Sequence, residues 1–262
     1  MARLAAWSII GVAAFAGLAH GAPAAVRVTT AMVELAGAEQ QVDVYRPQDV
    51  HMRGVAVVAH GWTRSRSRHS DLGRALAEAG VTAVIPDLPN VMNLWGNGDA
   101  IVDLVHRLEG GVLDLPPVPR PRLVLIGTSA GGLATLLASA DLPGLAGWIG
   151  LDPVDRTGTG KDAAARLAAP AIVLLAEPSG CNLFGSGRSL ARSLARGMRV
   201  QLIDGATHCD FESPTNNICR ALCGGASDAL QEQIRHATIE AVVELLSLEA
   251  ATAMPRHTVA AP

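Results

Sequence analysis

The sequence predicts an α/β protein with a mostly parallel sheet of eight strands and helices on both faces. Two observations lead to this prediction: short apolar segments alternate with longer amphipathic ones, and the central apolar segments are apolar throughout. The segments VAVVAH (55–60) and LVLIGT (123–128) show the second feature, which is typical of strands buried on both faces. No helical pattern separates the first two predicted strands, so we expect the sheet to begin with an antiparallel pair.

The predicted elements follow one another in a regular order. Strands are expected at residues 26–34, 41–45, 54–59, 82–86, 122–126, 147–151, 171–176 and 199–203. Helices are expected at residues 67–79, 99–109, 130–140, 161–167, 186–196 and 227–250. The segments between the strands are short, so we expect no large lid over the sheet and an open active surface.

The first 24 residues have the pattern of a secretory signal peptide. Arg3 is followed by an apolar stretch and then by small residues, which favours cleavage after Ala24 over cleavage after Gly21. A membrane anchor is the alternative, but the apolar stretch is short for a span of about 20 residues, and no stop-transfer pattern follows. We therefore expect an exported protein, secreted or periplasmic, with one domain at residues 25–250, a disordered tail at 251–262 and no stable membrane span after cleavage.

The charge balance gives no reason to expect a nucleic-acid partner. The formal net charge is −3 over 262 residues. Arg64, Arg66 and Arg68 alternate with serine in the segment TRSRSRH, and we interpret them as a solvated helix start rather than as a binding patch.

All four cysteines lie in the last third of the chain: Cys181, Cys209, Cys219 and Cys223. An even number of cysteines in an exported protein favours two disulfides, for which three pairings are possible. A zinc site would need further ligands, and His208 has a better use, so no metal and no cofactor are expected.

Ser129 lies where a predicted strand meets a predicted helix. Residues 127–131 read Gly-Thr-Ser-Ala-Gly, which fits the pattern G-x-S-x-G. A sharp strand-to-helix turn strains its middle residue and needs small neighbours, and it presents the serine Oγ above the sheet at a helix N-terminus. The alternative is a plain strand–helix turn, but the flanking patterns favour a nucleophile.

A serine nucleophile needs a base, and three histidines follow Ser129 in the sequence. His236 lies in a helical pattern and His257 lies in the predicted tail. His208 comes directly after the last predicted strand, in a loop that contains glycine. This position and the order along the chain favour His208 as the base.

The acid of such a triad is less well defined by the sequence. Asp152 ends one predicted strand and precedes a proline, which favours an extended turn there. Glu177 ends the next strand, and Asp155 follows Asp152 closely. We favour Asp152, with Glu177 as the alternative acid and Asp155 behind it.

The oxyanion of a tetrahedral intermediate needs two backbone donors. The residue after the nucleophile, Ala130, provides one N–H. The loop after the third strand, His60-Gly61-Trp62, is expected to provide the N–H of Trp62, because Gly61 allows the backbone to approach the site. Gly61 and Trp62 are also expected to contact substrate, although Trp62 could be a packing residue, and His60 is expected to hold the loop by hydrogen bonds.

Four motifs together, GTSAGG, HGW, GLDPVD and GATHCDF, resemble the α/β-hydrolase superfamily. Within it, residues 26–248 look like the lidless group that contains chlorophyllases, platelet-activating-factor acetylhydrolases and cutinase-like polyester hydrolases. The segment LDPVD is similar to the chlorophyllase segment that contains the acid. The acetylhydrolases also carry their aspartate after the sixth strand, so the resemblance favours Asp152 over Glu177.

The chain departs from two members of this group. The polyester hydrolases carry their aspartate after the seventh strand, where this chain has AEPSGC, and chlorophyllases usually carry arginine at the position of Ala130. The resemblance therefore favours neither polyester nor chlorophyll as the substrate.

We therefore expect an exported serine hydrolase that cleaves carboxylic esters with short to medium acyl chains through an acyl-enzyme. Its partner would be a small-molecule or lipid-like ester. The alternatives are a lipase, acyltransferase or peptidase with the same triad, because this fold carries many chemistries. A catalytically silent binding protein is the alternative from a different class.

Overall fold

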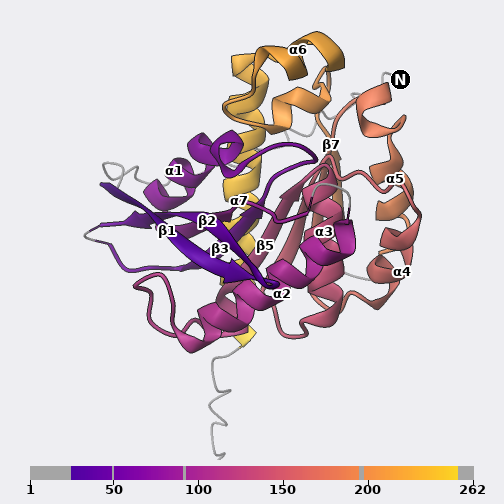
Figure 1. Cartoon of the computed structure of the whole chain (residues 1–262). Coiled ribbons are helices and arrows are strands. Elements are labelled where there is room, and N and C mark those ends of the chain that lie inside the picture. The colour runs from indigo at the N-terminus through magenta and orange to yellow at the C-terminus, as the bar shows by residue number, and fades with distance from the viewer. Residues whose placement is uncertain (1–24, 49, 91–92, 195–197, 253–262) are drawn as a thin grey trace, which may run out of the picture.

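The computed structural model describes residues 25–48, 50–90, 93–194 and 198–252 (Figure 1). The predicted signal peptide, residues 1–24, lies outside the described residues, as do residues 253–262 of the predicted tail. The last helix continues to Thr252, two residues into the segment that the sequence assigned to the tail. No helix in the described part of the chain is both long and apolar enough to cross a membrane.

One sheet of eight strands forms the centre of the molecule. The strands are β1 (Val26–Leu35), β2 (Ala38–Pro47), β3 (Gly54–Ala59), β4 (Val81–Pro86), β5 (Leu123–Thr128), β6 (Gly147–Leu151), β7 (Ala171–Leu175) and β8 (Met198–Leu202). Their order in the sheet is β1-β2-β4-β3-β5-β6-β7-β8. The pairs β1·β2 and β2·β4 are antiparallel and all others are parallel, which confirms the predicted mostly parallel sheet with an antiparallel start.

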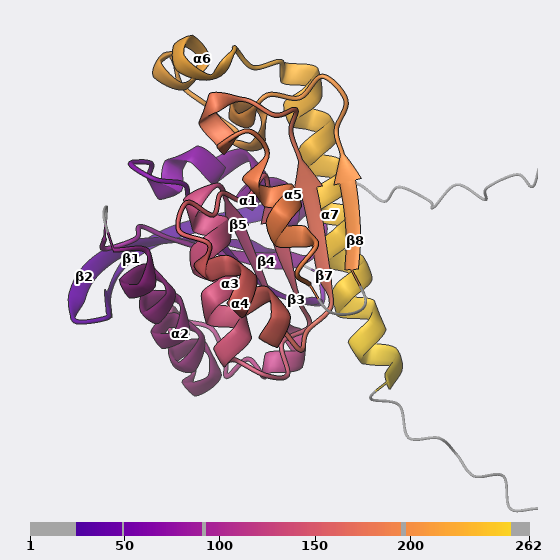
Figure 2. The ribbon, with the colours of Figure 1, turned by 90° about the vertical axis from the view of Figure 1, so that its right-hand side faces the viewer.

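Helices cover both faces of this sheet, as predicted (Figure 2). One face carries α2 (Leu94–Gly110), α3 (Ala130–Asp141), α4 (Thr159–Arg166) and α5 (Ser186–Ala191), and the other carries α1 (Ser70–Glu78) and α7 (Asp228–Thr252). Alternate side chains of the central strands enter the two cores. On β5, Leu123 and Leu125 pack with α2 and α3, whereas Val124 and Ile126 pack with α1 and α7. Strands buried on both faces therefore explain the continuous apolar segments of the sequence.

The helix α6 (Asn217–Cys223) was missed by the sequence analysis. The side chain of Asn216 caps its N-terminus by accepting a hydrogen bond from the Cys219 amide. Ile218 and Leu222 share one side of the helix, but both are largely exposed, so no buried apolar face marks this helix in the sequence. The predicted helix at 186–196 is shorter in the structure, where α5 ends at Ala191.

Four short 3₁₀ helices complete the described elements: η1 (Arg66–His69), η2 (Arg120–Arg122), η3 (Gly180–Asn182) and η4 (His208–Phe211). The expectation of a solvated basic cluster around η1 is wrong for Arg64 and Arg66. The Arg64 guanidinium donates to the buried Glu212 carboxylate, and Arg66 pairs with Asp43 and Asp87. These ion pairs hold the segment after β3 against β2, β4 and the loop after η4.

His69 is a buried histidine at the end of η1. Its side chain is 1% exposed, and neither ring nitrogen has a hydrogen-bond partner among the described residues. Burial lowers the pKa of His69 to about 4, although the nearby Glu212 carboxylate acts in the opposite direction. The folded protein therefore keeps this ring neutral over a pH range in which the unfolded chain protonates it.

We predict that His69 makes the fold sensitive to mild acid. The unfolded state binds the proton below pH 6.5 and the folded state only near pH 4, so stability is lost as the pH falls across this interval. The loss from this group is on the order of 3 kcal/mol. Urea unfolding between pH 6.5 and pH 4 should show that the free energy of unfolding depends less on pH in His69→Leu than in the wild type. The exposed His106, which forms no ion pair with a described residue, provides the control. His106→Gln should retain the wild-type slope, and equal slopes for all three proteins would contradict the assignment.

Candidate active site

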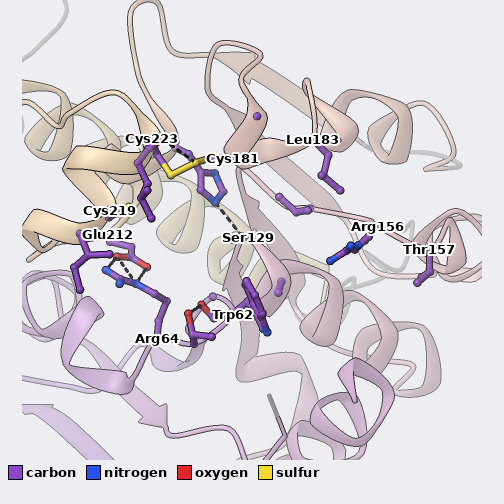
Figure 3. Close-up of a pocket in the computed structure, with 18 residues that line it drawn as sticks. Trp62, Arg64, Ser129, Arg156, Thr157, Cys181, Leu183, Glu212, Cys219 and Cys223 are labelled. Carbon is purple, nitrogen blue, oxygen red and sulfur yellow. Dashed lines mark hydrogen bonds and ion pairs between the residues drawn. A yellow bond between two sulfur atoms is a disulfide. The ribbon is translucent and has the colours of Figure 1, made fainter. Parts of the chain in front are cut away.

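Three of the residues singled out in the sequence meet at the carboxyl edge of the sheet. Ser129 follows β5, Asp152 follows β6, and His208 begins η4 after β8. His208 Nε2 lies 3.0 Å from Ser129 Oγ (Figure 3), and His208 Nδ1 lies 2.6 Å from Asp152 Oδ2. The side chains therefore form a continuous chain of hydrogen bonds at the edge where parallel α/β sheets usually bind ligands.

The turn that carries Ser129 is strained and tightly packed. Ser129 has φ 56° and ψ −123°, a conformation that L-residues rarely adopt. A Cβ atom on Gly127 would lie 2.2 Å from the carbonyl oxygen of Gly131, and one on Gly131 would lie 2.3 Å from that of His60. Glycine at both positions therefore lets the first turn of α3 pack directly on the ends of β5 and β3, as the motif predicts.

Backbone hydrogen bonds hold this turn against the neighbouring strand. The Ser129 amide donates to the carbonyl of Leu151 at the end of β6, and the Ser129 carbonyl accepts from the amides of Gly132 and Val154, each over 3.0 Å. The nucleophile position is thus fixed relative to the segment that carries Asp152.

Asp152 is a buried carboxylate, 1% exposed, with several donors around it. Its Oδ1 accepts from the Ala176 amide over 3.1 Å, and its Oδ2 accepts from Asn182 Nδ2 over 3.1 Å in addition to its contact with His208. The prediction of an extended conformation before Pro153 is wrong, because Asp152 has a positive φ of 41°. Aspartate is among the few non-glycine residues that adopt positive φ readily.

The other two candidate acids do not contact His208. The Glu177 carboxylate is half-exposed and lies 4.0 Å from Arg188 Nη2. The Asp155 carboxylate accepts hydrogen bonds from the amides of Thr157, Gly158 and Gly160, so it stabilises its own loop.

Asn182 is a part of the site that the sequence analysis missed. Its side chain is fully buried, and its Nδ2 donates to Asp152 and to the Glu177 carbonyl. Its Oδ1 accepts from the amides of Ser179 and Gly185. Both polar atoms of this amide are therefore satisfied: Oδ1 holds the loop of Asn182, and Nδ2 links that loop to Asp152. In the sequence, Asn182 follows Gly-Cys and precedes leucine, as an ordinary turn residue would, so the sequence gives no signal that it binds Asp152.

His60 orients the loop that contains Gly61 and Trp62. Its Nδ1–H donates to the Gly61 carbonyl over 2.8 Å, and its Nε2 accepts from the Leu88 amide over 3.0 Å. This pattern requires a neutral ring, and burial lowers the His60 pKa, which favours the same state. A Cβ on Gly61 would lie 3.2 Å from Ser129 Cβ, so the loop runs beside the serine.

The backbone N–H groups of Trp62 and Ala130 have no hydrogen-bond partner among the residues the structure describes. Both residues line the pocket beside Ser129. These are the two amides that the sequence analysis assigned to an oxyanion hole. The indole of Trp62 is half-exposed, with 54% of its surface accessible, so Trp62 is not a core residue.

The pocket beside Ser129 has a volume of about 650 Å³. Apolar side chains form much of its wall, from the loops after β3, β6 and β7 and from α6: Trp62, Val154, Leu183, Ile218 and Leu222. Arg64, Glu212 and Arg156 add charged groups to the lining (Figure 3). The site thus offers a hydroxyl, an imidazole and a mainly apolar cavity of small-molecule size.

Many solved structures share this architecture, including the following two. One is the dienelactone hydrolase from Anabaena variabilis ATCC 29413, with 15% identity, a TM-score of 0.64, and coverage of 85% of this chain and 98% of that chain. The other is Est1E from Butyrivibrio proteoclasticus, with 16% identity, a TM-score of 0.62, and coverage of 85% and 99%. The chain has the α/β-hydrolase fold. At these identities the likeness concerns the fold, and no protein-family model and no curated protein matches the sequence.

Two disulfides join α6 to the rest of this α/β-hydrolase fold: Cys181–Cys223 and Cys209–Cys219. This is one of the three pairings that the sequence left open. Cys209 directly follows His208, and Cys181 directly precedes Asn182. The helix that forms part of the pocket wall is therefore linked covalently to the loop of the histidine and to the loop that fixes Asp152.

We predict that Gly131→Ala destabilises the protein, because the new methyl group would collide with backbone carbonyls of β3 that no rotamer change can move. The expected loss is about 1–3 kcal/mol of unfolding free energy. Gly110→Ala is the matched control, because a Cβ on Gly110 meets nothing within 4 Å. Urea unfolding of both variants measures the difference, and equal stabilities would contradict the close approach of α3 to β3.

We also predict that Asn182→Ala costs about 1–3 kcal/mol of stability, because the variant removes the side-chain acceptor of the Ser179 and Gly185 amides and one of the donors to the buried Asp152 carboxylate. The exposed Asn217 is the control, and Asn217→Ala should change stability by less than about 0.5 kcal/mol. Thermal unfolding of both variants tests this. A loss at Asn182 no larger than at Asn217 would mean that the buried network contributes nothing to stability.

Proposed function

We propose that this protein is an exported serine hydrolase that cleaves carboxylic esters with short to medium acyl chains through an acyl-enzyme on Ser129. The observation that carries the proposal is the chain of hydrogen bonds from Ser129 Oγ through His208 to Asp152. A serine hydroxyl is a weak nucleophile by itself, and a hydrogen-bonded imidazole with a carboxylate behind it is the arrangement that activates it.

In the proposed first step, His208 Nε2 takes the Ser129 proton while Oγ attacks the ester carbonyl carbon. The Asp152 carboxylate stabilises the imidazolium and keeps the Nδ1–H tautomer. His208 then protonates the leaving alcohol, and the acyl group stays on Ser129. Water, deprotonated by His208, attacks the acyl carbon. The bond from this carbon to Ser129 Oγ then breaks, His208 returns the proton to Oγ, and the carboxylic acid leaves.

The N–H groups of Trp62 and Ala130 are the proposed donors to the oxyanion. They suit the role because both residues line the pocket and neither amide is bonded to another described residue. Loss of one such donor typically costs about 3–4 kcal/mol of transition-state stabilisation. His60 keeps the Trp62 amide available by fixing the loop, without taking part in the chemistry.

The ester substrate is inferred from the cavity and from one structural neighbour. A pocket of about 650 Å³ with apolar walls suits an acyl chain of short or medium length. The neighbour from Anabaena variabilis is named a dienelactone hydrolase, and a lactone is a cyclic ester. The two disulfides favour an oxidising compartment, which agrees with export.

We predict that Ser129→Ala abolishes hydrolysis of p-nitrophenyl butyrate, and that Asp152→Asn lowers kcat by about 10⁴-fold because the imidazole loses its orienting partner. Glu177→Gln is the matched control and should retain wild-type rates, since this carboxylate does not contact His208. Steady-state kinetics on the three variants tests the assignment. Turnover by Ser129→Ala, or a larger loss in Glu177→Gln than in Asp152→Asn, would refute it.

The same assay separates the alternatives. A series of ester chain lengths, with and without an acceptor alcohol, distinguishes an esterase from a lipase or an acyltransferase. Labelling with a fluorophosphonate distinguishes an enzyme from a silent binding protein, because a Ser129 that resists the reagent would favour the binding protein.

A further inference from the structure

Among the described residues that line the pocket, one cationic side chain forms no ion pair. Apart from His208, the described residues that line it include three with a charged side chain: Arg64, Arg156 and Glu212. Arg64 and Glu212 neutralise each other, because Arg64 Nε donates to Glu212 Oε1 over 2.7 Å and Arg64 Nη2 also donates to this carboxylate. Arg156 forms no hydrogen bond and no ion pair with any described residue.

The acid next to Arg156 in the sequence is not available as its partner. Both oxygens of the Asp155 carboxylate are occupied by amides of the same loop, with contacts of 2.8 Å to Gly158 and 3.0 Å to Gly160. Arg156 is an exposed residue of the pocket lining, and its guanidinium forms no ion pair with a described carboxylate. In Figure 3 it lies across the pocket from the Arg64–Glu212 pair, with its nitrogen end directed toward Ser129.

The backbone that carries Arg156 is fixed relative to the nucleophile. The Val154 amide donates to the Ser129 carbonyl over 3.0 Å, and the Asp155 carboxylate holds the residues that follow. An arginine placed in this way can reach a group on a bound substrate while the loop itself stays in position.

We propose that Arg156 recognises a carboxylate on the substrate, so that the preferred esters are anionic. This inference rests on the proposed esterase function and names the substrate class of that same site. A guanidinium binds a carboxylate through two parallel hydrogen bonds. One unpaired positive charge suits a monoanion, and the apolar side chain of Leu183, on the same side of the pocket as Arg156 (Figure 3), suits a hydrocarbon segment between the ester and the carboxylate.

The test compares esters that differ only in charge. One pair places the charge on the acyl side: the mono-p-nitrophenyl ester of glutaric acid and the same compound with its free acid methylated. The other pair places it on the alcohol side: para-acetoxybenzoate and its methyl ester. Within each pair the same triad acts on the same bond, so the ratio of the two kcat/KM values reports recognition of the charge and is insensitive to the fraction of folded enzyme.

We expect the wild type to favour the anionic ester in at least one pair, and Arg156→Gln to lower that ratio by about three- to tenfold. Arg156→Lys should restore part of the ratio, because it keeps the charge but loses the two-pronged geometry. The matched control is Arg188→Gln, since Arg188 lies outside this pocket, and it should leave the ratio unchanged. Added salt should lower the wild-type ratio.

Two results would overturn the proposal, and they can be told apart. If the wild type hydrolyses the neutral esters through Ser129 but Arg156→Gln leaves both ratios unchanged, Arg156 does not select the substrate and the proposed esterase function stands. If no ester in either pair is hydrolysed and fluorophosphonate does not label Ser129, the proposed function fails, and the assignment of a substrate class fails with it.

Discussion

The close approach of α3 to the ends of β3 and β5 is the constraint on which the site depends. Gly131 lies against the carbonyls of Ala59 and His60, and Gly127 lies against the carbonyl of Gly131, with no room for a Cβ atom at either position. This contact forces Ser129 into its strained conformation and aligns the start of α3 with the serine. Packing of the buried helix α3 on the sheet offsets the strain.

From that contact a series of hydrogen bonds runs along the carboxyl edge of the sheet. Ser129 bonds to Leu151 at the end of β6, and Asp152 bonds to Leu174 of β7 through its amide. The Asp152 carboxylate then bonds to Ala176, Asn182 and His208. Each loop is positioned by the strand beside it, so the side chains of Ser129, Asp152 and His208, from three separate loops, meet within hydrogen-bond distance. The two disulfides add a covalent link from α6 to two of these loops, and such links typically contribute about 2–4 kcal/mol each.

The sequence was sufficient for the architecture because its signals are local. The apolar segments predict the strands, and the glycines at positions 127 and 131 predict a tight turn, each from a few neighbouring residues. The order of strands and helices then predicts a mostly parallel sheet. The positions of Ser129, Asp152 and His208 at strand ends also follow from this order, and the structure brings them together, although their catalytic roles stay a prediction.

The features that the sequence did not predict depend on contacts between distant segments. Three of the four partners of Asn182 lie in its own loop, but the fourth, Asp152, lies 30 residues away in the sequence, and this bond makes Asn182 part of the site. The short helix α6 depends on a cap and two disulfides rather than on an apolar face. Arg64 resembled a solvated cation in the sequence, but its partner Glu212 lies in a segment that approaches it only across the fold.

The central claim is that Ser129 is the nucleophile and that the Trp62 and Ala130 amides bind the oxyanion of the tetrahedral intermediate. A crystal structure of the protein after reaction with an alkyl fluorophosphonate tests this claim most directly. The account predicts a covalent bond from Ser129 Oγ to phosphorus, with the phosphoryl oxygen about 2.7–3.1 Å from both amide nitrogens and His208 Nε2 beside the bonded oxygen. An adduct on another residue, or a phosphoryl oxygen directed away from these two amides, would contradict it.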